Sequence, residues 1–162
     1  MKYLKTFEHI SEDIKDDFIN KVSNDDSDSI LKYIKKYKNE IVNFNYNGKF
    51  TPLMYAALYN SWKVATVLIQ HGADMNQKDS MDETPLMIAC NQAERHNHMD
   101  VIDVLIKGGA DWNITKDKRN STTNKKYFLD FLNDHLRNQI IKKYPEKYND
   151  YLIKKDSSTY NL

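Results

Sequence analysis

The stretch TPLMYA at residues 51–56 decides the fold of this chain, because it returns as TPLMIA at residues 84–89, a shift of 33 residues. A second stretch, VLIQHGADMN at 67–76, returns as VLIKGGADWN at 104–113. Two long matches in the same order indicate an internal repeat. Periods between about 20 and 50 residues are typical of architectures in which supersecondary units stack on one another.

Each copy of the repeat contains residues that begin and end two short helices. Thr51 can cap a helix that Pro52 begins, since proline at the first helical position lacks only an N–H that would be unpaired anyway. Asn60 suits a left-handed turn, and Gly72 ends a second helix with an i, i+3, i+4 apolar stripe. We therefore expect the equivalent apolar residues of both copies to be buried between repeats: Leu53, Val67, Leu68, Leu86, Val104 and Leu105.

This pattern resembles the ankyrin repeat, whose motifs are T-P-L-H-x-A and L-L-x-x-G-A-D-x-N. The resemblance implies an all-α ankyrin-repeat solenoid of about four helix-turn-helix units, with imperfect capping repeats at the two ends. The predicted division is an N-terminal capping repeat (1–45), a regular repeat (46–78), a second regular repeat with an insertion (79–117), a C-terminal capping repeat (118–145) and a tail (146–162). Single units cannot bury their apolar faces, so neighbours must stack.

The flanks and insertions depart from the regular pattern. The run Asp25–Ser29 offers side chains that start a helix, and Tyr127–Leu132 resembles the first helix of a closing repeat. Four extra residues near 93–96 are predicted to lie between the paired helices of the second regular repeat, and 115–126 (TKDKRNSTTNKK) to form a polar loop. Pro145 is expected to break the last repeat's helix, leaving one short helix and a frayed end.

Composition points to the cytoplasm. No stretch approaches the ~18 apolar residues that a membrane span needs, so no membrane contact is predicted. The N-terminus lacks the apolar core of a secretory signal. The single cysteine, Cys90, fits a reducing compartment. The chain has 21 Lys and 3 Arg, and its opening MKYLKTFE resembles leader segments of some phage proteins, which suggests a viral or phage-borne modulator acting in the host cytoplasm.

Motifs for catalysis and metal binding do not occur. The sequence holds no phosphate-binding loop, nucleophile elbow or dinucleotide fingerprint, so we expect no enzyme activity and no cofactor. Cys90, His96 and His98 invite comparison with a zinc site, but a fourth ligand at a recognisable spacing is missing. The Asp25–Ser29 run lacks the central Gly and terminal Glu of a calcium loop. No metal site is predicted.

The ankyrin resemblance implies that hairpin tips and the inner faces of first helices form a concave surface that binds another protein. Aromatic and methionine side chains on such a surface are typical of interface hot spots. Phe50 is expected to be exposed at a tip unless a partner covers it. The chain is expected to be a monomer until it binds a partner, and binding that occupies the partner's surface can inhibit that partner. The predicted protein-binding residues are Asn47, Lys49, Phe50, Leu58, Tyr59, Ser80, Met81, Glu83, Asn91 and Gln92.

Charge leaves a second interpretation open. Residues 1–30 carry four Lys and eight acids, whereas residues 107–162 carry twelve Lys or Arg and seven acids. A basic loop can hold phosphates, so the alternative function is a regulator that contacts nucleic acid through Lys116, Lys118, Arg119, Lys125 and Lys126 together with the Lys-rich C-terminus. The pI near 7.8 counts against this alternative, because nucleic-acid-binding domains are usually more basic.

Overall fold

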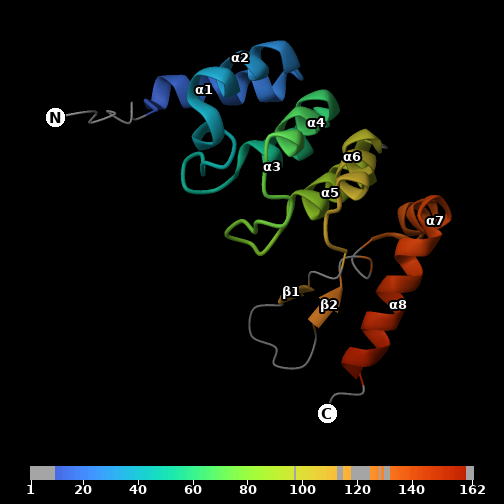
Figure 1. Cartoon of the computed structure of the whole chain (residues 1–162). Helices are drawn as coiled ribbons and strands as arrows, with labels where there is room; N and C mark the ends of the chain where they lie inside the picture. Colours follow the sequence, from blue (N-terminus) through green and yellow to red (C-terminus); the bar gives the residue numbers. More distant parts are fainter. Residues whose placement is uncertain are drawn as a thin grey trace.

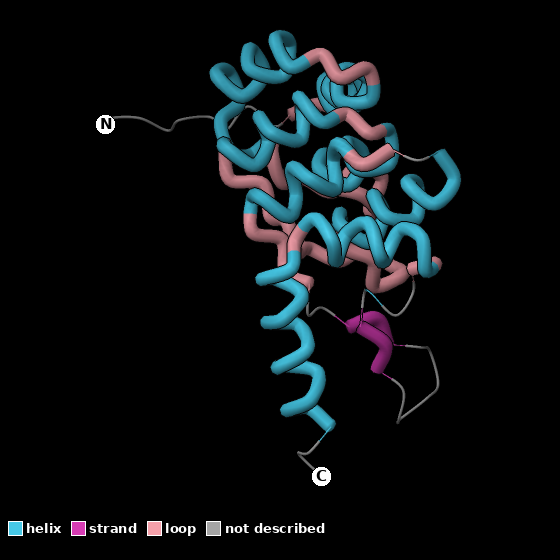
Figure 2. Tube along the Cα trace, turned by 90° about the vertical axis from the view of Figure 1, so that its right-hand side faces the viewer, coloured by secondary structure: helices cyan, strands magenta, loops and turns pink. Residues whose placement is uncertain are grey.

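The computed structural model describes residues 10–96, 98–112, 115–117, 125–127, 129 and 132–159 of the chain. Three helix pairs follow one another: α1 (Glu12–Ser23) with α2 (Ser27–Tyr37), α3 (Pro52–Tyr59) with α4 (Trp62–Gln70), and α5 (Pro85–His96) with α6 (Asp100–Gly108). A short 3-10 turn, η1 (Lys38–Ile41), follows α2. α1 packs on α3 and α3 on α5, while α2 packs on α4 and α4 on α6, so the pairs stack in two layers (Figures 1 and 2). The predicted all-α repeat solenoid is confirmed.

The two first helices begin as the repeated motif predicts. Thr51 is the N-cap of α3, and its Oγ1 accepts a hydrogen bond from the Met54 N–H at 3.3 Å. Thr84 Oγ1 accepts in the same way from the Met87 N–H at 3.4 Å. In each case the proline of the motif is the first residue of the helix. The side chain satisfies a backbone donor that the helix itself cannot pair.

Hydrogen bonds between consecutive repeats set how they stack. Asp25 and Asn60 turn the chain between paired helices with positive φ angles of 54° and 56°. The Val64 N–H donates to Asp25 Oδ1 at 2.9 Å, and the Val101 N–H donates to Asn60 Oδ1 at 3.3 Å. The turn of one repeat therefore caps the second helix of the next, which fixes the offset between neighbouring repeats.

A matching pair of asparagines ties the repeats together where the second helices end. The Asp74 N–H donates to Asn43 Oδ1 at 2.9 Å, and the Asp111 N–H donates to Asn76 Oδ1, also at 2.9 Å. Asn43 and Asn76 lie 33 residues apart, so the same bond recurs with the period of the repeat.

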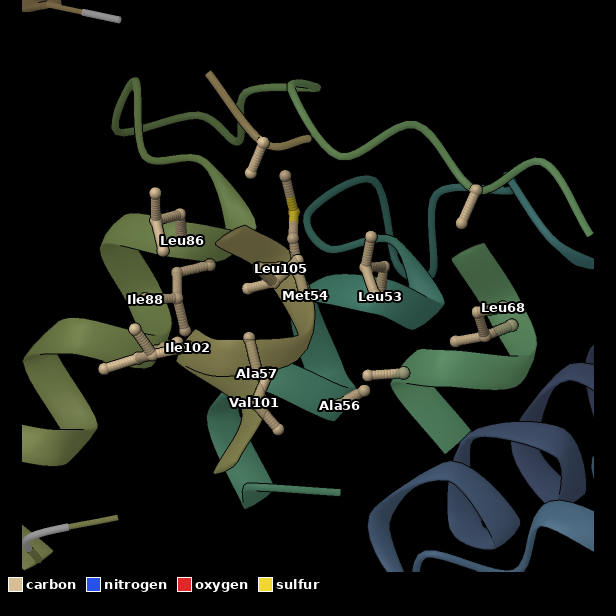
Figure 3. Packing of buried hydrophobic residues seen from close by; sticks show 14 of the residues in the cluster. Leu53, Met54, Ala56, Ala57, Leu68, Leu86, Ile88, Val101, Ile102 and Leu105 are labelled. Carbon is tan, nitrogen blue, oxygen red and sulfur yellow. The ribbon is translucent and has the colours of Figure 1, made fainter. Parts of the chain in front are cut away.

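The buried apolar residues form one cluster through the stack. Figure 3 shows the part of this core that α3, α4, α5 and α6 contribute. Four of the six residues expected there, Leu53, Leu68, Leu86 and Leu105, are buried as predicted. The prediction for Val67 and Val104 is wrong, since both are only partly buried. In each second helix the buried residues lie four apart, as Val64 and Leu68 do, and the valine one position before the leucine lies beside that face.

The N-terminal helix pair has the features expected of a capping repeat. Asp26 is the N-cap of α2, and its Oδ1 accepts from the Ser29 N–H at 3.1 Å. The hydrogen bonds from Ser29 hold the pKa of the Asp26 carboxyl below its usual value. The acidic run thus starts a helix, as predicted. The exact residue boundaries assigned to the capping repeats stay predictions.

The four extra residues near 93–96 extend α5 and do not form a separate loop, so the predicted place of the insertion is wrong. α5 has 12 residues where α3 has 8. Ala93 is buried and continues the face of Ala89 one turn earlier, which favours continuing the helix. The added turn reaches the C-terminal unit, because Glu94 Oε1 accepts from the Asn133 N–H at 2.6 Å.

A small hairpin stands where a polar loop and the start of a helix were predicted. β1 (Thr115–Asp117) and β2 (Lys125–Tyr127) pair antiparallel, with Lys116 opposite Lys126. A helix beginning at Tyr127 is therefore wrong. Thr115 and Tyr127 face each other in the ladder, and both residue types favour strands. Leu129 and Leu132 follow and are buried.

Two helices end the described chain: α7 (Asp134–Lys143) and α8 (Pro145–Thr159). Pro145 separates them, as predicted. The predicted tail helix is present, but it is longer than expected, since α8 runs for 15 residues. Tyr144 Oη donates to Asp103 Oδ1 at 2.7 Å, and Lys143 forms an ion pair with the same carboxylate on α6. Among the described residues, no helix is both long enough and apolar enough to cross a membrane.

Candidate functional site

One side of the stack is formed by α1, α3 and α5 together with the loops 44–50 and 77–83 that precede α3 and α5; we call it the first-helix face. All ten predicted protein-binding residues belong to it. Six of them are exposed: Asn47, Lys49, Tyr59, Ser80, Met81 and Asn91. The other four are partly buried: Phe50, Leu58, Glu83 and Gln92.

Tyr59 is the most exposed aromatic residue of the described chain, at 55% of its surface. Its ring stacks on that of Tyr55, with centroids 6.5 Å apart and planes 9° from parallel. Burial and the neighbouring Tyr59 raise the pKa of the Tyr55 hydroxyl. Because Tyr55 is partly buried beneath it, Tyr59 presents a large aromatic surface from a supported position.

Phe50 differs from its prediction, because it is partly buried and not a freely exposed tip residue. The Tyr46 N–H donates to the Phe50 carbonyl at 2.9 Å, closing a turn in which Asn47 and Gly48 have positive φ angles. This turn folds Phe50 back, so that its ring meets the Tyr55 ring edge-on at 5.6 Å. Phe50 therefore supports the aromatic surface more than it extends it.

Sequence reasoning missed Tyr46 and Asp16. The Tyr46 ring contacts that of Tyr55 edge-on at 5.7 Å, and its hydroxyl donates to Asp16 Oδ1 of α1 at 2.5 Å. That bond raises the pKa of the Tyr46 hydroxyl. On the other side Tyr46 meets Phe44, which contacts Phe18 in the core of the first repeat. The alternation of aromatic residues at 44 and 46, just before the T-P-L motif, is the signal that predicts a packed extended segment here.

The second loop holds Met81 outward by bonds to a buried carboxylate. Asp79 is buried, and its Oδ1 accepts from the backbone N–H groups of Met81 and Glu83, both at 2.8 Å. Met81 itself is 49% exposed. Glu83 Oε1 accepts from Asn91 Nδ2 at 3.3 Å, which joins the loop to α5. The structure thus links Glu83 with Asn91, and Phe50 with Tyr59 through Tyr55.

The basic residues of the alternative interpretation lie elsewhere. Lys116, Lys125 and Lys126 are strand residues of the hairpin, while Lys118 and Arg119 lie outside the described residues. The predicted contact with nucleic acid stays a prediction.

The titratable residues considered for metal binding do not form a site in the described ranges. Cys90 is buried in α5, and burial raises the pKa of its thiol well above the usual value. The rings of His96 and His98 lie 5.8 Å apart on the surface. No group of three or more His, Cys, Asp or Glu side chains suited to a metal ion occurs among residues that the structure describes.

Comparison with known proteins defines the class. The family model for ankyrin repeats (3 copies) matches residues 18–116, more than half of the chain. This protein belongs to the ankyrin-repeat family.

Curated relatives share parts of the chain. Human protein fem-1 homolog C is 42% identical over 57 residues, which are 35% of this chain and 9% of that protein. Human protein phosphatase 1 regulatory subunit 27 is 28% identical over 100 residues, 62% of each chain. A probable E3 ubiquitin-protein ligase of rice, XBOS33, is 34% identical over 61 residues, 38% of this chain and 11% of that protein. The chain therefore spans less than two thirds of each of these relatives.

Ankyrin repeats indicate a protein–protein interaction module, and ankyrin-repeat proteins are generally non-catalytic. The first-helix face, with its supported aromatic and methionine side chains, is the candidate surface for that interaction.

Proposed function

We propose that this protein binds a partner protein through the first-helix face, with Tyr59 and Met81 as the central contacts. The observation that carries the proposal is their exposure, 55% and 49%, on supports that are themselves packed or hydrogen-bonded. Large apolar side chains held in a fixed position lose little conformational entropy on binding. Such residues dominate the free energy of binding at protein interfaces.

We further propose that binding regulates the partner by occupying its surface. Similarity to a protein named as a phosphatase regulatory subunit supports a regulatory role of this kind. The opening MKYLKTFE lies outside the described residues, and together with the Lys-rich composition it supports a viral or phage-borne inhibitor that acts in the host cytoplasm.

The test is affinity capture with matched variants. The wild-type chain, Tyr59→Ala, Met81→Ala and Trp62→Ala are immobilised separately, and proteins retained from a lysate are quantified by mass spectrometry. A true partner is retained by wild type and lost on Tyr59→Ala or Met81→Ala. After the partner is purified, its free energy of binding should be about 2 kcal/mol less favourable for Tyr59→Ala, as expected for a hot-spot residue.

Trp62→Ala is the matched control. Trp62 is an exposed aromatic residue, at 45%, but it lies on α4 in the other layer of helices. Its truncation should leave capture unchanged, and all variants should keep the wild-type melting temperature. If a partner is lost by Trp62→Ala but retained by Tyr59→Ala, the binding surface lies instead on the layer formed by α2, α4 and α6.

A further inference from the structure

The two strongly exposed aromatic rings of the described residues, Tyr59 and Trp62, differ in whether a lysine lies over them. Within the described residues, lysines lie over the rings of Phe44, Tyr37, Trp62, Tyr144 and Tyr151, at 4.8 to 6.0 Å from the centroid. Trp62, the other strongly exposed ring, is thus accompanied by Lys63. No described lysine lies over Tyr55 or Tyr59. The most exposed ring is also one that the described chain does not cover with a cation.

Acidic stretches lie in α1 and in the loop before α5, and these two helices pack on either side of α3. Residues 12–17 of α1 hold four carboxylates and one lysine, and residues 78–83 hold three carboxylates and one lysine. Asp16 is connected to the Tyr55–Tyr59 stack through Tyr46. The Tyr46 hydroxyl donates to Asp16, and the Tyr46 ring packs against Tyr55. On the α5 side Glu83 is joined to Asn91.

The lysines within these two stretches are already engaged by neighbouring acids. Lys15 pairs with Glu12 at 2.8 Å and lies over Phe44, and Lys78 pairs with Asp82 at 3.9 Å. Of the remaining residues in the loops of this face, Lys49 is the one further cation. The segments on either side of α3 therefore carry an excess of negative charge, and Asp16 links one of them to the aromatic stack.

We propose that the first-helix face binds a lysine- or arginine-bearing segment of a partner protein, with one cationic side chain lying over the Tyr59–Tyr55 stack. This inference rests on the proposed function and names the chemistry of the partner. A cation is attracted to the face of an aromatic ring, and the surrounding carboxylates strengthen that attraction and select against acidic segments.

The test uses a phage-displayed library of random dodecapeptides, selected on the full chain at low salt. The peptides that depend on Tyr59 should be enriched in Lys and Arg. One selected peptide and its version with every Lys and Arg replaced by Gln are then synthesised with a fluorescent label, and their affinities are measured by polarisation. The Gln version should bind at least about 10-fold more weakly, and added salt should weaken the cationic peptide alone.

Two pairs of variants separate charge and aromaticity from shape. Tyr59→Phe keeps the ring and should bind within 2-fold of wild type, whereas Tyr59→Leu keeps apolar bulk and should bind about 2- to 5-fold more weakly. Asp16→Asn keeps an acceptor for the Tyr46 hydroxyl and removes the charge, so affinity should fall about 2- to 5-fold. The matched control, Asp28→Asn on the exposed side of α2, should change nothing.

The outcomes distinguish this inference from the proposed function. If Tyr59-dependent peptides are neutral or acidic, or if Tyr59→Leu binds as well as wild type, the basic partner is overturned while the binding surface stands. If no selected peptide depends on Tyr59 or Met81, both proposals fail. If sedimentation shows self-association that Asp16→Asn abolishes, the occupant is a second copy of this chain and not a separate basic partner.

Discussion

At the scale of single residues, two tyrosine hydroxyls fasten loops and helices to the acidic start of α1. Tyr33 of α2 donates to Asp17, and Tyr46 of the loop before α3 donates to Asp16. A phenol bonded to a carboxylate resists losing its proton, because ionisation would place two negative charges side by side. The bond to Asp17 raises the pKa of Tyr33 from 10.0 to about 12.

This shift predicts how stability depends on alkaline pH. Between pH 10 and 12 the unfolded chain releases the Tyr33 proton while the folded chain keeps it, so the folded state binds more protons and its stability falls as pH rises. The stabilisation is fully present below pH 10. Tyr33→Phe removes this titration, so the urea midpoint of the variant should fall less steeply between pH 10 and 12 than that of wild type. Parallel pH profiles for the two proteins would contradict the assignment.

At the scale of elements, adjacent apolar residues of the repeated motif are not buried equally. Val67 and Leu68 are adjacent in the first copy of the motif, as Val104 and Leu105 are in the second, and the sequence predicts burial for all four. In the structure Leu68 is fully buried and Val67 is only partly buried beside it. A repeat alignment shows which positions are equivalent, but which of two adjacent apolar residues faces the core depends on the rotation of the helix.

Truncation of Leu68 and of Val67 should therefore lower the free energy of unfolding by different amounts. Leu68→Ala should lower the free energy of unfolding by ~2–5 kcal/mol, since it leaves a cavity between α4 and its neighbours. Val67→Ala should cost about 1 kcal/mol or less, because the side chain is partly solvated already. Urea denaturation followed by far-UV circular dichroism measures both. Equal losses would mean that the helix is rotated relative to this structure.

At the scale of the whole molecule, the repeat period predicts the middle of the chain better than its ends. The caps of α3 and α5 and the left-handed turn at Asn60 follow from local chemistry and are found as predicted. The insertion was misplaced because a family alignment does not reveal that Ala93 continues a buried helical face. The sequence does not predict the hairpin and predicts α8 too short, because nothing in the repeat specifies either element.

The candidate site shows the same division. Motif positions predicted the exposure of Tyr59 and Met81, but their support depends on contacts distant in sequence. Tyr46 reaches Asp16 across 30 residues, and no period in the sequence encodes that pair. The same dependence on side-chain geometry explains why Phe50 was predicted to be exposed, since the turn at Asn47 decides where its ring goes.

The C-terminal helices join the repeats through buried apolar residues such as Leu136 and Ile140 and through a set of polar contacts. We expect the polar contacts to control how often these two helices open separately from the repeats. Asp103 of α6 accepts from the Tyr144 hydroxyl and pairs with Lys143, while Glu94 accepts from the Asn133 backbone. In stacked repeats each unit is stabilised mainly by its neighbours, so weakening one junction frees the end unit without unfolding the rest. Asp103→Ala removes both contacts made by its carboxylate. A hydrogen bond to a charged group contributes about 1.5–3 kcal/mol, so local opening should become roughly 10- to 100-fold more frequent.

Amide hydrogen exchange measures this opening segment by segment. In Asp103→Ala, exchange should accelerate across 134–159 and stay at the wild-type rate across 52–70, where the first regular helix pair lies. Lys107→Ala, an exposed change on the same helix α6, is the matched control and should leave both segments unchanged. Uniform acceleration along the chain would instead mean that α7 and α8 unfold together with the repeats, and unchanged exchange in 134–159 would mean that the Asp103 contacts do not hold the two helices in place.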